Sequence, residues 1–234
     1  MSYQIAIDGP AGAGKSTIAK KVARLKEFIY VDTGAMYRAM AYYLFSKQVD
    51  PKDEEAVSRE CRGAHITIQY VDGEQVVLLN GENVNPYLRT EEVGNMASLT
   101  SKNPKVRERL TQLQKELARQ NDVVMDGRDI GTCVLPDADV KVYLTASVEV
   151  RAKRRYDELT AKGVSCDIHQ IEEDIAKRDG QDMNREIAPL KQAEDAVLVD
   201  SSNMTIDEVV QAILTLCKSV SYTHLRAHET TLHL

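Results

Sequence analysis

The sequence predicts an α/β fold built on a five-stranded, mainly parallel sheet. Five short runs are apolar throughout rather than alternating, as expected for strands that are covered on both faces. The segments between these runs carry helical patterns, and strands that alternate with helices are typical of a parallel sheet. The predicted strands are Gln4–Asp8, Phe28–Asp32, Asp122–Asp126, Val140–Thr145 and Ala196–Asp200.

Four of these five runs end in aspartate. The carboxyl ends of parallel strands meet at one edge of the sheet, which is the edge where such sheets bind ligands. We therefore expect polar groups, and a functional site, at that edge.

Two helices are marked clearly. In residues 104–120 apolar side chains recur at i, i+4, i+7 and i+11 from Val106, and Pro104 stands where a first helical turn tolerates it. Thr205 and Glu208 have the spacing of a capping box that opens a final helix. Residues 65–84 break the alternation, because turn signals at Asp72-Gly73 and Asn80-Gly81 separate short strand-like runs. We interpret them as a small antiparallel insert.

Composition narrows the class of protein. The 234 residues, 43% apolar and 28% charged, are typical of one globular domain with a real core. A net charge of −6 argues against sequence-independent binding to nucleic acid. No run approaches the ~20 apolar residues of a membrane span, and the N-terminus lacks signal-peptide features. We expect a cytoplasmic protein without a nucleic-acid or membrane partner. The spacing of the four cysteines matches no zinc or redox site, so we expect free thiols.

Residues 221–234 follow the final helix without a turn signal or a core face, and we interpret them as a non-native extension. His224 and His228 have the i, i+4 spacing of a metal site on a helix, but a flexible extension is the preferred interpretation.

Residues 9–16 match the P-loop pattern GxxxxGK(S/T), with a predicted strand before them and a helix after them. Glycines let backbone N–H groups turn toward phosphate oxygens, and the N-terminus of the helix adds positive potential. Lys15 would reach the β- and γ-phosphates, and the Ser16 hydroxyl would ligate Mg²⁺. The predicted nucleotide-binding residues are Gly9, Pro10, Ala11, Gly12, Ala13, Gly14, Lys15, Ser16 and Thr17.

A P-loop indicates a nucleoside triphosphate but not its use. The Asn-Lys-x-Asp motif of GTPases and the Leu-Ser-Gly-Gly-Gln signature of transporter ATPases are absent from the sequence. A small kinase needs arginines for the acceptor phosphate and the transferring group. Such arginines follow the second and third strands, at Arg38 and Arg128. Arg178, Asp182 and Arg185 are spaced i, i+4, i+7 and are predicted on one helical face, which alone could be an ordinary salt-bridge face.

From residue 3 to about 218 the chain resembles the bacterial cytidylate kinases, the CMP/dCMP kinases among the nucleoside monophosphate (NMP) kinases. Five stretches carry the resemblance, in the family's order and spacing: "IAIDGPAGAGKST", "YVDTGAMYR", "NMASLTSKNPKVRERL", "DGRDIGTCVLPDADVKVYL" and "KRDGQDMNREIAPL". The resemblance implies a three-layer fold of the P-loop NTPase type, with an NMP-binding insert at about 63–90 and a helical lid at about 150–167. The core would be residues 1–62, 91–149 and 168–220.

The resemblance also implies ATP-dependent phosphorylation of CMP and dCMP, with ATP and Mg²⁺, by a protein that we expect to be a monomer. The cytosine ring would meet Thr33, Arg107 and Asp129. The ribose would meet Ser98, Arg178 and Asp182. The acceptor phosphate would meet Arg38, Arg128 and Arg185.

Arginines in the lid would close over the triphosphate and exclude water. They are Arg151, Arg154 and Arg155, which as a bare charge run would form a solvated face. Catalysis would rest on Lys15, Arg128, Arg154 and Arg185. Glu27 departs from the family, which frequently has glycine there.

Two other functions stay open. One is a P-loop kinase for another small acceptor, such as UMP or a non-nucleotide metabolite. The other is a nucleotide-binding regulator without turnover, although Arg38, Arg128 and Arg185 would be of no use to it.

Overall fold

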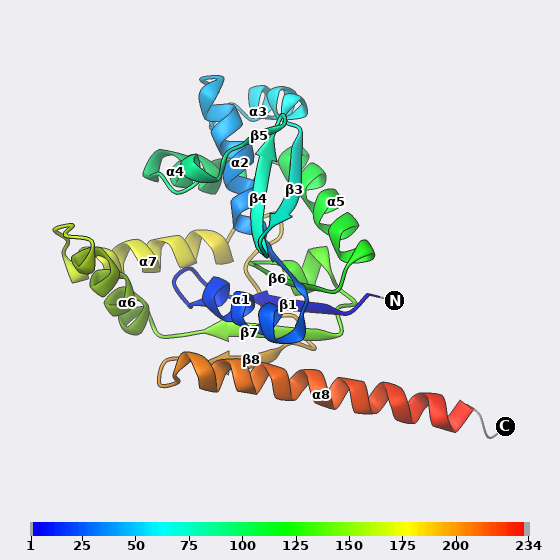
Figure 1. The fold of residues 1–234 in the computed structure, drawn as a ribbon. Coiled ribbons are helices and arrows are strands. Elements are labelled where there is room, and N and C mark those ends of the chain that lie inside the picture. The colour runs from blue at the N-terminus through cyan, green and yellow to red at the C-terminus, as the bar shows by residue number, and fades with distance from the viewer. Residues whose placement is uncertain (1, 232–234) are drawn as a thin grey trace. The chain divides into compact units, whose positions relative to one another are not determined.

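The computed structural model describes residues 2–231, and for residues 219–231 it describes the course of the backbone. The main sheet has five strands in the order β2-β6-β1-β7-β8 (Figure 1). The predicted α/β fold with a five-stranded parallel sheet is confirmed, and strand boundaries differ from those predicted by at most one residue. The strands are β1 (Gln4–Asp8), β2 (Ile29–Asp32), β6 (Val123–Gly127), β7 (Val140–Thr145) and β8 (Val197–Asp200).

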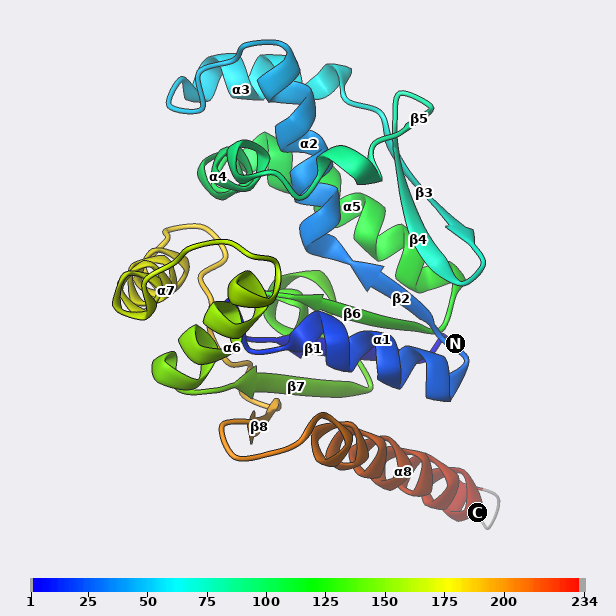
Figure 2. The ribbon, with the colours of Figure 1, turned by 60° about the vertical axis from the view of Figure 1, so that its left-hand side comes forward.

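The chain divides into two compact units. The first, called unit 1 here, comprises residues 29–123 with Ser2, and unit 2 comprises residues 3–28 and 124–231. In unit 1, two helices, α4 and α5, pack against α2 (Thr33–Ser46). The hairpin of β3 (Ile66–Val71) and β4 (Glu74–Leu79) packs on the same helix (Figure 2). Its helices are α2 (Thr33–Ser46), α3 (Glu54–Glu60), α4 (Glu91–Thr100), α5 (Pro104–Gln120) and the short 3-10 turns Cys61–Gly63 and Asn85–Tyr87.

The predicted antiparallel insert is confirmed. It is a three-stranded sheet in the order β3-β4-β5, formed by β3 (Ile66–Val71), β4 (Glu74–Leu79) and β5 (Glu82–Asn83). Both turn signals have the positive φ values of tight hairpin turns, 52° and 78° at Asp72-Gly73 and 52° and 88° at Asn80-Gly81. Tyr70 lies opposite Gln75 across the first hairpin, so their side chains share one face of the insert.

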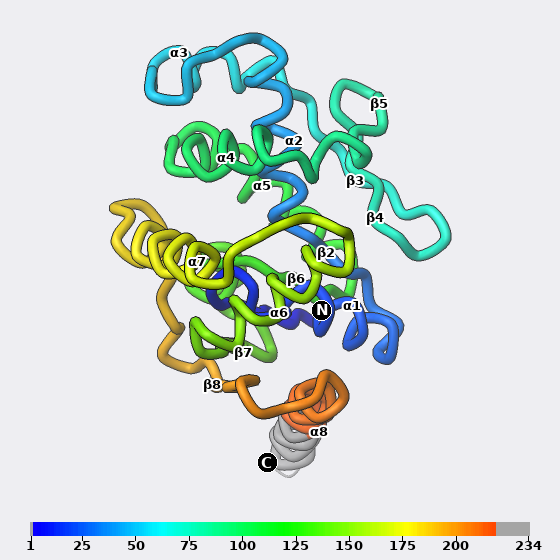
Figure 3. Tube along the Cα trace, turned by 90° about the vertical axis from the view of Figure 1, so that its left-hand side faces the viewer, coloured from blue at the N-terminus to red at the C-terminus, as the bar shows by residue number. Residues whose placement is uncertain are grey.

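Unit 2 contains α1 (Lys15–Lys26), α6 (Val148–Ala161), α7 (Ile168–Met183) and α8 (Ile206–Thr231). A π-helical segment, Ile130–Val134, follows β6. α8 packs against α1 and β7, and α6 lies beside α7 (Figure 3). The capping box is confirmed, since the Glu208 carboxylate accepts from the Thr205 N–H at 2.8 Å and the Glu208 N–H donates to the Thr205 hydroxyl at 3.3 Å.

The structure corrects the placement of Arg185. The i, i+7 spacing from Arg178 predicts both on one helical face, but α7 ends at Met183 and Arg185 lies beyond it. Asn184 ends the helix, since its side-chain amide donates to the Gly180 carbonyl at 2.8 Å and satisfies one of the last helical acceptors. Pro189 follows shortly after, and Ala188 before it has φ +48°, so the helix does not continue.

The structure shows why glycine would suit position 27, where this chain has Glu27. It is the C-cap of α1, with φ 59° and ψ 32°, and its N–H donates hydrogen bonds to the carbonyls of Ala23 and Arg24. This left-handed conformation favours glycine, and any other residue there costs about 1 kcal/mol.

Three further expectations concern the termini and the cysteines. The cysteines Cys61, Cys133, Cys166 and Cys217 are free thiols, as expected. Over the described residues, every helix is too short or too polar to cross a bilayer. α8 continues through Thr231, so it includes most of the segment that we interpret as a non-native extension. That interpretation stays a prediction, and the side chains of His224 and His228 lie outside the described ones.

Candidate functional site

The loop between β1 and α1 has a backbone that only glycine allows at its first position. Gly9 has φ +149°, and a Cβ there would lie 1.9 Å from the Leu144 carbonyl oxygen. Gly14, with φ +87°, precedes the first turn of α1 and supplies no side chain to cap it. The N–H groups of that turn can therefore serve an anion, as the P-loop pattern predicts.

Lys15 is buried beneath this loop, with 6% of its surface exposed. Its Nζ donates to the Pro10 carbonyl at 2.8 Å. Burial, together with the neighbouring Arg128 guanidinium, lowers the pKa of its ammonium group to about 7, while nearby carboxylates act in the opposite direction. A buried cation of this kind is favoured by any additional negative charge at the loop.

Ser16, in the first turn of α1, lies beside Asp126, which is near the end of β6. The Ser16 hydroxyl donates to Asp126 Oδ2 at 2.8 Å, and Asp126 is buried. A hydroxyl and a carboxylate are the hard oxygen donors that Mg²⁺ prefers, so the donor set fits the predicted ion. Ser16 was expected from the P-loop pattern and Asp126 was not, although its place at the end of a predicted strand was the signal that could have found it.

Asp8, at the end of β1, holds the segment that follows β6. Its carboxylate accepts from the backbone N–H groups of Ile130 at 2.8 Å and Gly131 at 2.7 Å. Burial raises the pKa of Asp8 to about 6, although these two hydrogen bonds act to lower it. The contact fixes the backbone directly after Arg128 and Asp129. Only the position of Asp8 at a strand end pointed to such a role in the sequence.

Four of the predicted site residues are brought together in two ion pairs. Arg128 Nε donates to Asp182 Oδ2 at 2.9 Å, and Arg185 Nη2 lies 3.4 Å from Asp129 Oδ1. The Arg185–Asp129 pair is almost fully buried, and the Arg128–Asp182 pair retains some exposure. Arg178 lies on the exposed surface of α7. Unit 2 therefore holds arginine side chains together with the loop and Lys15.

Of the three predicted lid arginines, Arg151 contacts the P-loop. Its guanidinium donates to the Ala11 carbonyl at 2.9 Å, to the Ala146 carbonyl at 2.8 Å and to Asp179 Oδ2 at 2.6 Å. Its aliphatic stem also lies against Gly12, where a Cβ would come within 3.4 Å of the Arg151 Cβ. Asp179, its buried partner on α7, was not predicted, because no local spacing links the two residues.

The other two lid arginines lie on the exposed surface of α6. Arg154 donates to the Ser201 carbonyl at 2.8 Å, and Arg155 pairs with Glu158 at 2.9 Å. Arg155 thus has the contact of a solvated helix face, whereas Arg154 is tied to the residue after β8. The predicted contact of both with a triphosphate stays a prediction.

Unit 1 contains the remaining predicted residues. Asp32 ends β2 and caps α2, because its Oδ1 accepts from the Ala35 N–H at 2.8 Å. Its Oδ2 lies 3.4 Å from Arg38 Nη2. Thr33 is buried in the first turn of α2. The Arg38 side chain is partly exposed, and its pairing with Asp32 orients the guanidinium from one side.

Arg107 and Ser98 lie on α5 and α4. Arg107 is buried, and its guanidinium stands 5.8 Å from the ring centroid of Tyr37, one helical turn after Thr33. Arg107 therefore lies near the part of α2 that begins with Thr33. Ser98 is half-buried on α4.

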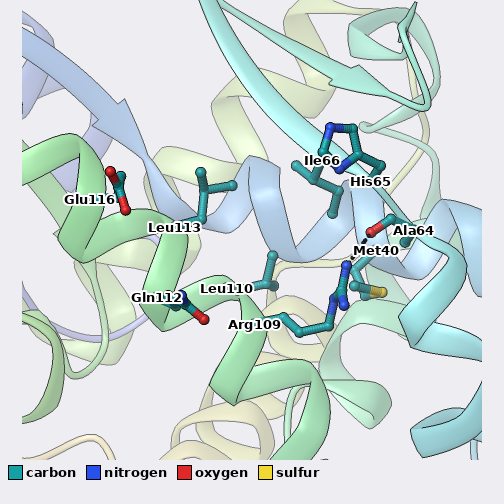
Figure 4. Close-up of a pocket in the computed structure, with 9 residues that line it drawn as sticks. All are labelled: Met40, Ala64, His65, Ile66, Arg109, Leu110, Gln112, Leu113 and Glu116. Atoms are coloured by element: carbon teal, nitrogen blue, oxygen red, sulfur yellow. Dashed lines mark hydrogen bonds between the residues drawn. The ribbon is translucent and has the colours of Figure 1, made fainter.

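A groove of about 280 Å³ in unit 1 contains none of the predicted site residues (Figure 4). Apolar side chains of α2, α5 and β3 form part of its wall, and Arg109 at its edge donates to the Ala64 carbonyl at 3.0 Å. Its lining is Met40, Ala64, His65, Ile66, Arg109, Leu110, Gln112, Leu113 and Glu116.

Known proteins resemble the chain over nearly its whole length. The family model described as cytidylate kinase matches residues 5–219. Cytidylate kinase of Caldicellulosiruptor bescii is 50% identical over 212 residues, covering 91% of this chain and 94% of the relative. Cytidylate kinase of Shouchella clausii is 49% identical over 219 residues, covering 94% and 97%.

Solved structures support the fold. An uncharacterized protein of Eubacterium ventriosum is similar with a TM-score of 0.53 at 12% identity, over 93% of this chain and 99% of that one. A gluconokinase of Sinorhizobium meliloti gives 0.51 at 13% identity, over 97% and 98%. At such low identity these two likenesses concern the fold alone.

Proposed function

Because the chain belongs to the cytidylate kinase family, we propose that it transfers the γ-phosphoryl group of ATP to CMP and dCMP, which yields ADP with CDP or dCDP. The observation that carries this proposal is the arrangement in unit 2. The P-loop, the buried Lys15, the Ser16–Asp126 pair and the arginines Arg128 and Arg185 belong to the same compact unit. Phosphoryl transfer needs alignment and charge neutralisation more than covalent chemistry, and these groups supply both.

Each group has a distinct part in the reaction. The backbone N–H groups of residues 9–17, apart from Pro10, which has none, would bind the phosphates of ATP, and Lys15 would neutralise charge on the β- and γ-phosphates. Ser16 and Asp126 would hold Mg²⁺, which would supply positive charge to offset that of the phosphates. The acceptor is a phosphate that is already ionised at neutral pH, so the reaction hardly needs a general base.

Roles toward the acceptor follow from the residue matches with the family. We assign Arg38, Arg128 and Arg185 to the acceptor phosphate, because a guanidinium fork gives paired, charge-assisted hydrogen bonds. We assign Thr33, Arg107 and Asp129 to the cytosine ring. We assign Ser98, Arg178 and Asp182 to the ribose.

The lid arginines Arg151, Arg154 and Arg155 are assigned to the triphosphate, with Arg154 acting on the transferring group. The contact of Arg151 with the Ala11 carbonyl supports its assignment, because it places a guanidinium beside the loop. We further propose that the protein acts as a monomer in the cytoplasm and that its reaction belongs to pyrimidine nucleotide metabolism.

A coupled assay of ADP release against a panel of acceptors tests the proposal. The panel is CMP, dCMP, UMP, AMP and GMP, and a reaction without acceptor measures ATP hydrolysis. CMP and dCMP should exceed UMP, AMP and GMP in kcat/KM by up to ~10⁴-fold, because a buried hydrogen-bond set rejects a mispaired base. Equal kcat/KM for CMP and AMP would contradict the substrate assignment. ADP release with none of the acceptors would instead favour a nucleotide-binding regulator.

A further inference from the structure

The insert hairpin contacts the end of β2 through one amide side chain. Gln75 on β4 accepts from the Asp32 N–H through Oε1 at 2.9 Å, and its Nε2 donates to the Asp32 carbonyl at 3.2 Å. A single side chain thus satisfies both backbone groups of Asp32, as a neighbouring strand would. This pairing fixes the position of the last residue of β2.

A second contact from the same face of the hairpin supports the first. Tyr70, directly opposite Gln75 across the hairpin, donates its hydroxyl to the Tyr30 carbonyl at 3.1 Å. Burial raises the pKa of Tyr70 above its usual value, so the hydroxyl stays protonated and can donate. Asn85 in turn holds the β4 backbone, since its Nδ2 donates to the Gln75 carbonyl at 2.9 Å. The hairpin is therefore itself held in place where it meets β2.

Asp32 connects this contact with two predicted acceptor-binding residues, Thr33 and Arg38. Its carboxylate caps α2 at Ala35 and lies 3.4 Å from Arg38 Nη2. Arg89, near the end of the insert, lies 3.8 Å from the same carboxylate. Because Thr33 and Arg38 stand in the first two turns of α2, a displacement of Asp32 would displace both of them.

We propose that Gln75 is a positioning residue for the acceptor nucleotide, which acts by holding the Asp32 backbone and through it Thr33 and Arg38. The inference rests on the proposed function, which gives Thr33 and Arg38 their roles. It makes the insert a working part of the acceptor site, although Gln75 itself need not touch the acceptor.

The test compares two glutamines of one hairpin. Gln75→Met keeps the length of the side chain and removes both hydrogen bonds. Gln69, beside Tyr70 on the adjacent position of β3, faces the opposite side and is exposed, so Gln69→Met is the matched control. Gln75→Met should raise KM for CMP about tenfold, as expected for two lost hydrogen bonds, with KM for ATP unchanged. Gln69→Met should change neither constant.

Hydrogen exchange provides a second readout that a general loss of stability would not reproduce. The Asp32 amide should exchange faster in Gln75→Met, with amides of β1 and β7 unchanged. Should Gln75→Met not fold, Tyr70→Phe is the milder variant, for which a smaller rise in KM for CMP is expected. If the unmodified protein does not phosphorylate CMP, the proposed function fails and this inference with it. If the unmodified protein turns over CMP normally but KM is unchanged in Gln75→Met, or rises equally for ATP, the inference alone is overturned.

Discussion

The P-loop region of unit 2 and the end of β2 in unit 1 are both held by side chains from distant parts of the chain, but the side chains differ in charge. Around the P-loop the holding groups are ionic and mostly buried, as in the Arg151–Asp179 pair at 2.6 Å and the Asp8 carboxylate on two N–H groups. At the end of β2 the holding groups are the neutral side chains of Gln75 and Tyr70.

This difference sets how each region should respond to change. A buried charge that loses its partner is left uncompensated, so the P-loop region should lose much stability when one group is removed. A half-exposed amide or hydroxyl leaves groups that water can partly satisfy, so the end of β2 should lose little. We interpret the first region as a rigid frame for phosphate and the second as a support whose main effect is on acceptor binding.

The largest effect is expected for Lys15→Ala. Turnover should fall by roughly 10³-fold or more, because the lost charge acts on the transferring phosphoryl group. The fold should persist, since the variant removes a buried cation whose pKa is already lowered by burial. Steady-state kinetics with circular dichroism measure both, and Lys20→Ala, on the exposed side of α1, is the control. Near-normal turnover in Lys15→Ala would remove the P-loop assignment.

The ionic frame itself is tested by Asp179→Ala. The free energy of unfolding should fall by about 3–5 kcal/mol, because Arg151 keeps its buried guanidinium without the carboxylate. Gln75→Met should cost only about 1 kcal/mol. Denaturant titration measures both values, with Asp174→Ala on the exposed side of α7 as the control.

The double variant Arg151→Met/Asp179→Leu should recover most of that loss, because no charge is then buried. An equal fall in the free energy of unfolding in Asp179→Ala and Gln75→Met would contradict the proposed difference between the two regions.

Dependence on pH should distinguish the regions through Asp8. Its pKa in the folded protein is raised to about 6 from 3.8, so the folded state binds the proton more tightly than the unfolded state does. The stability contributed by this group is therefore greatest at low pH and declines as pH rises through 6. Relative to Asp8→Asn, the free energy of unfolding of the unmodified protein should fall by about 2 kcal/mol between pH 4 and pH 6.5. Denaturation at several pH values checks the sign, and a flat difference would show that Asp8 does not titrate there.

Variants of Asp182 and Arg185 should distinguish contacts with the ribose from contacts with the acceptor phosphate. Asp182→Ala should lower kcat/KM for CMP about tenfold more than for an analogue without both ribose hydroxyls, because a carboxylate suits hydroxyl donors. Arg185→Ala should penalise both acceptors alike. Kinetics with the two acceptors measure this, and circular dichroism excludes unfolding. An equal penalty in Asp182→Ala would mean that Asp182 serves to position Arg128, with which it pairs at 2.9 Å.

The smallest expected effect lies outside both regions. Glu27→Gly should raise the free energy of unfolding by about 1 kcal/mol, because glycine adopts the left-handed C-cap conformation without strain. Denaturant titration should detect the gain, and turnover should stay the same. An unchanged stability would mean that the Glu27 side chain makes a compensating contact.

Local pattern was sufficient to predict much of the fold. The helix over 104–120 has the predicted bounds, and the strands, hairpin turns and capping box come from signals within a few residues of each other. The P-loop is also a contiguous motif, so its place between β1 and α1 could be predicted.

The rest of the site depends on contacts that no local spacing encodes. Ser16 and Asp126 are 110 residues apart, and Asp8 and Gly131 are 123 apart. Gln75 meets Asp32 through its side chain across 43 residues. The one local rule that failed concerned Arg185, because the helical spacing was extended past a helix end that Asn184 and Pro189 determine.

The discontinuous make-up of unit 2 has a consequence for biosynthesis. The P-loop leaves the ribosome well before β7, the strand that pairs with β1 and places Val140 opposite Ile5. At about 5–20 residues per second, the nascent loop waits roughly 6 to 25 s for that partner strand. Asp126 and Arg151, which hold the loop, are also translated late. Nucleotide binding is therefore a property that the chain acquires only after Arg151 has been made, although its binding motif is made well before that.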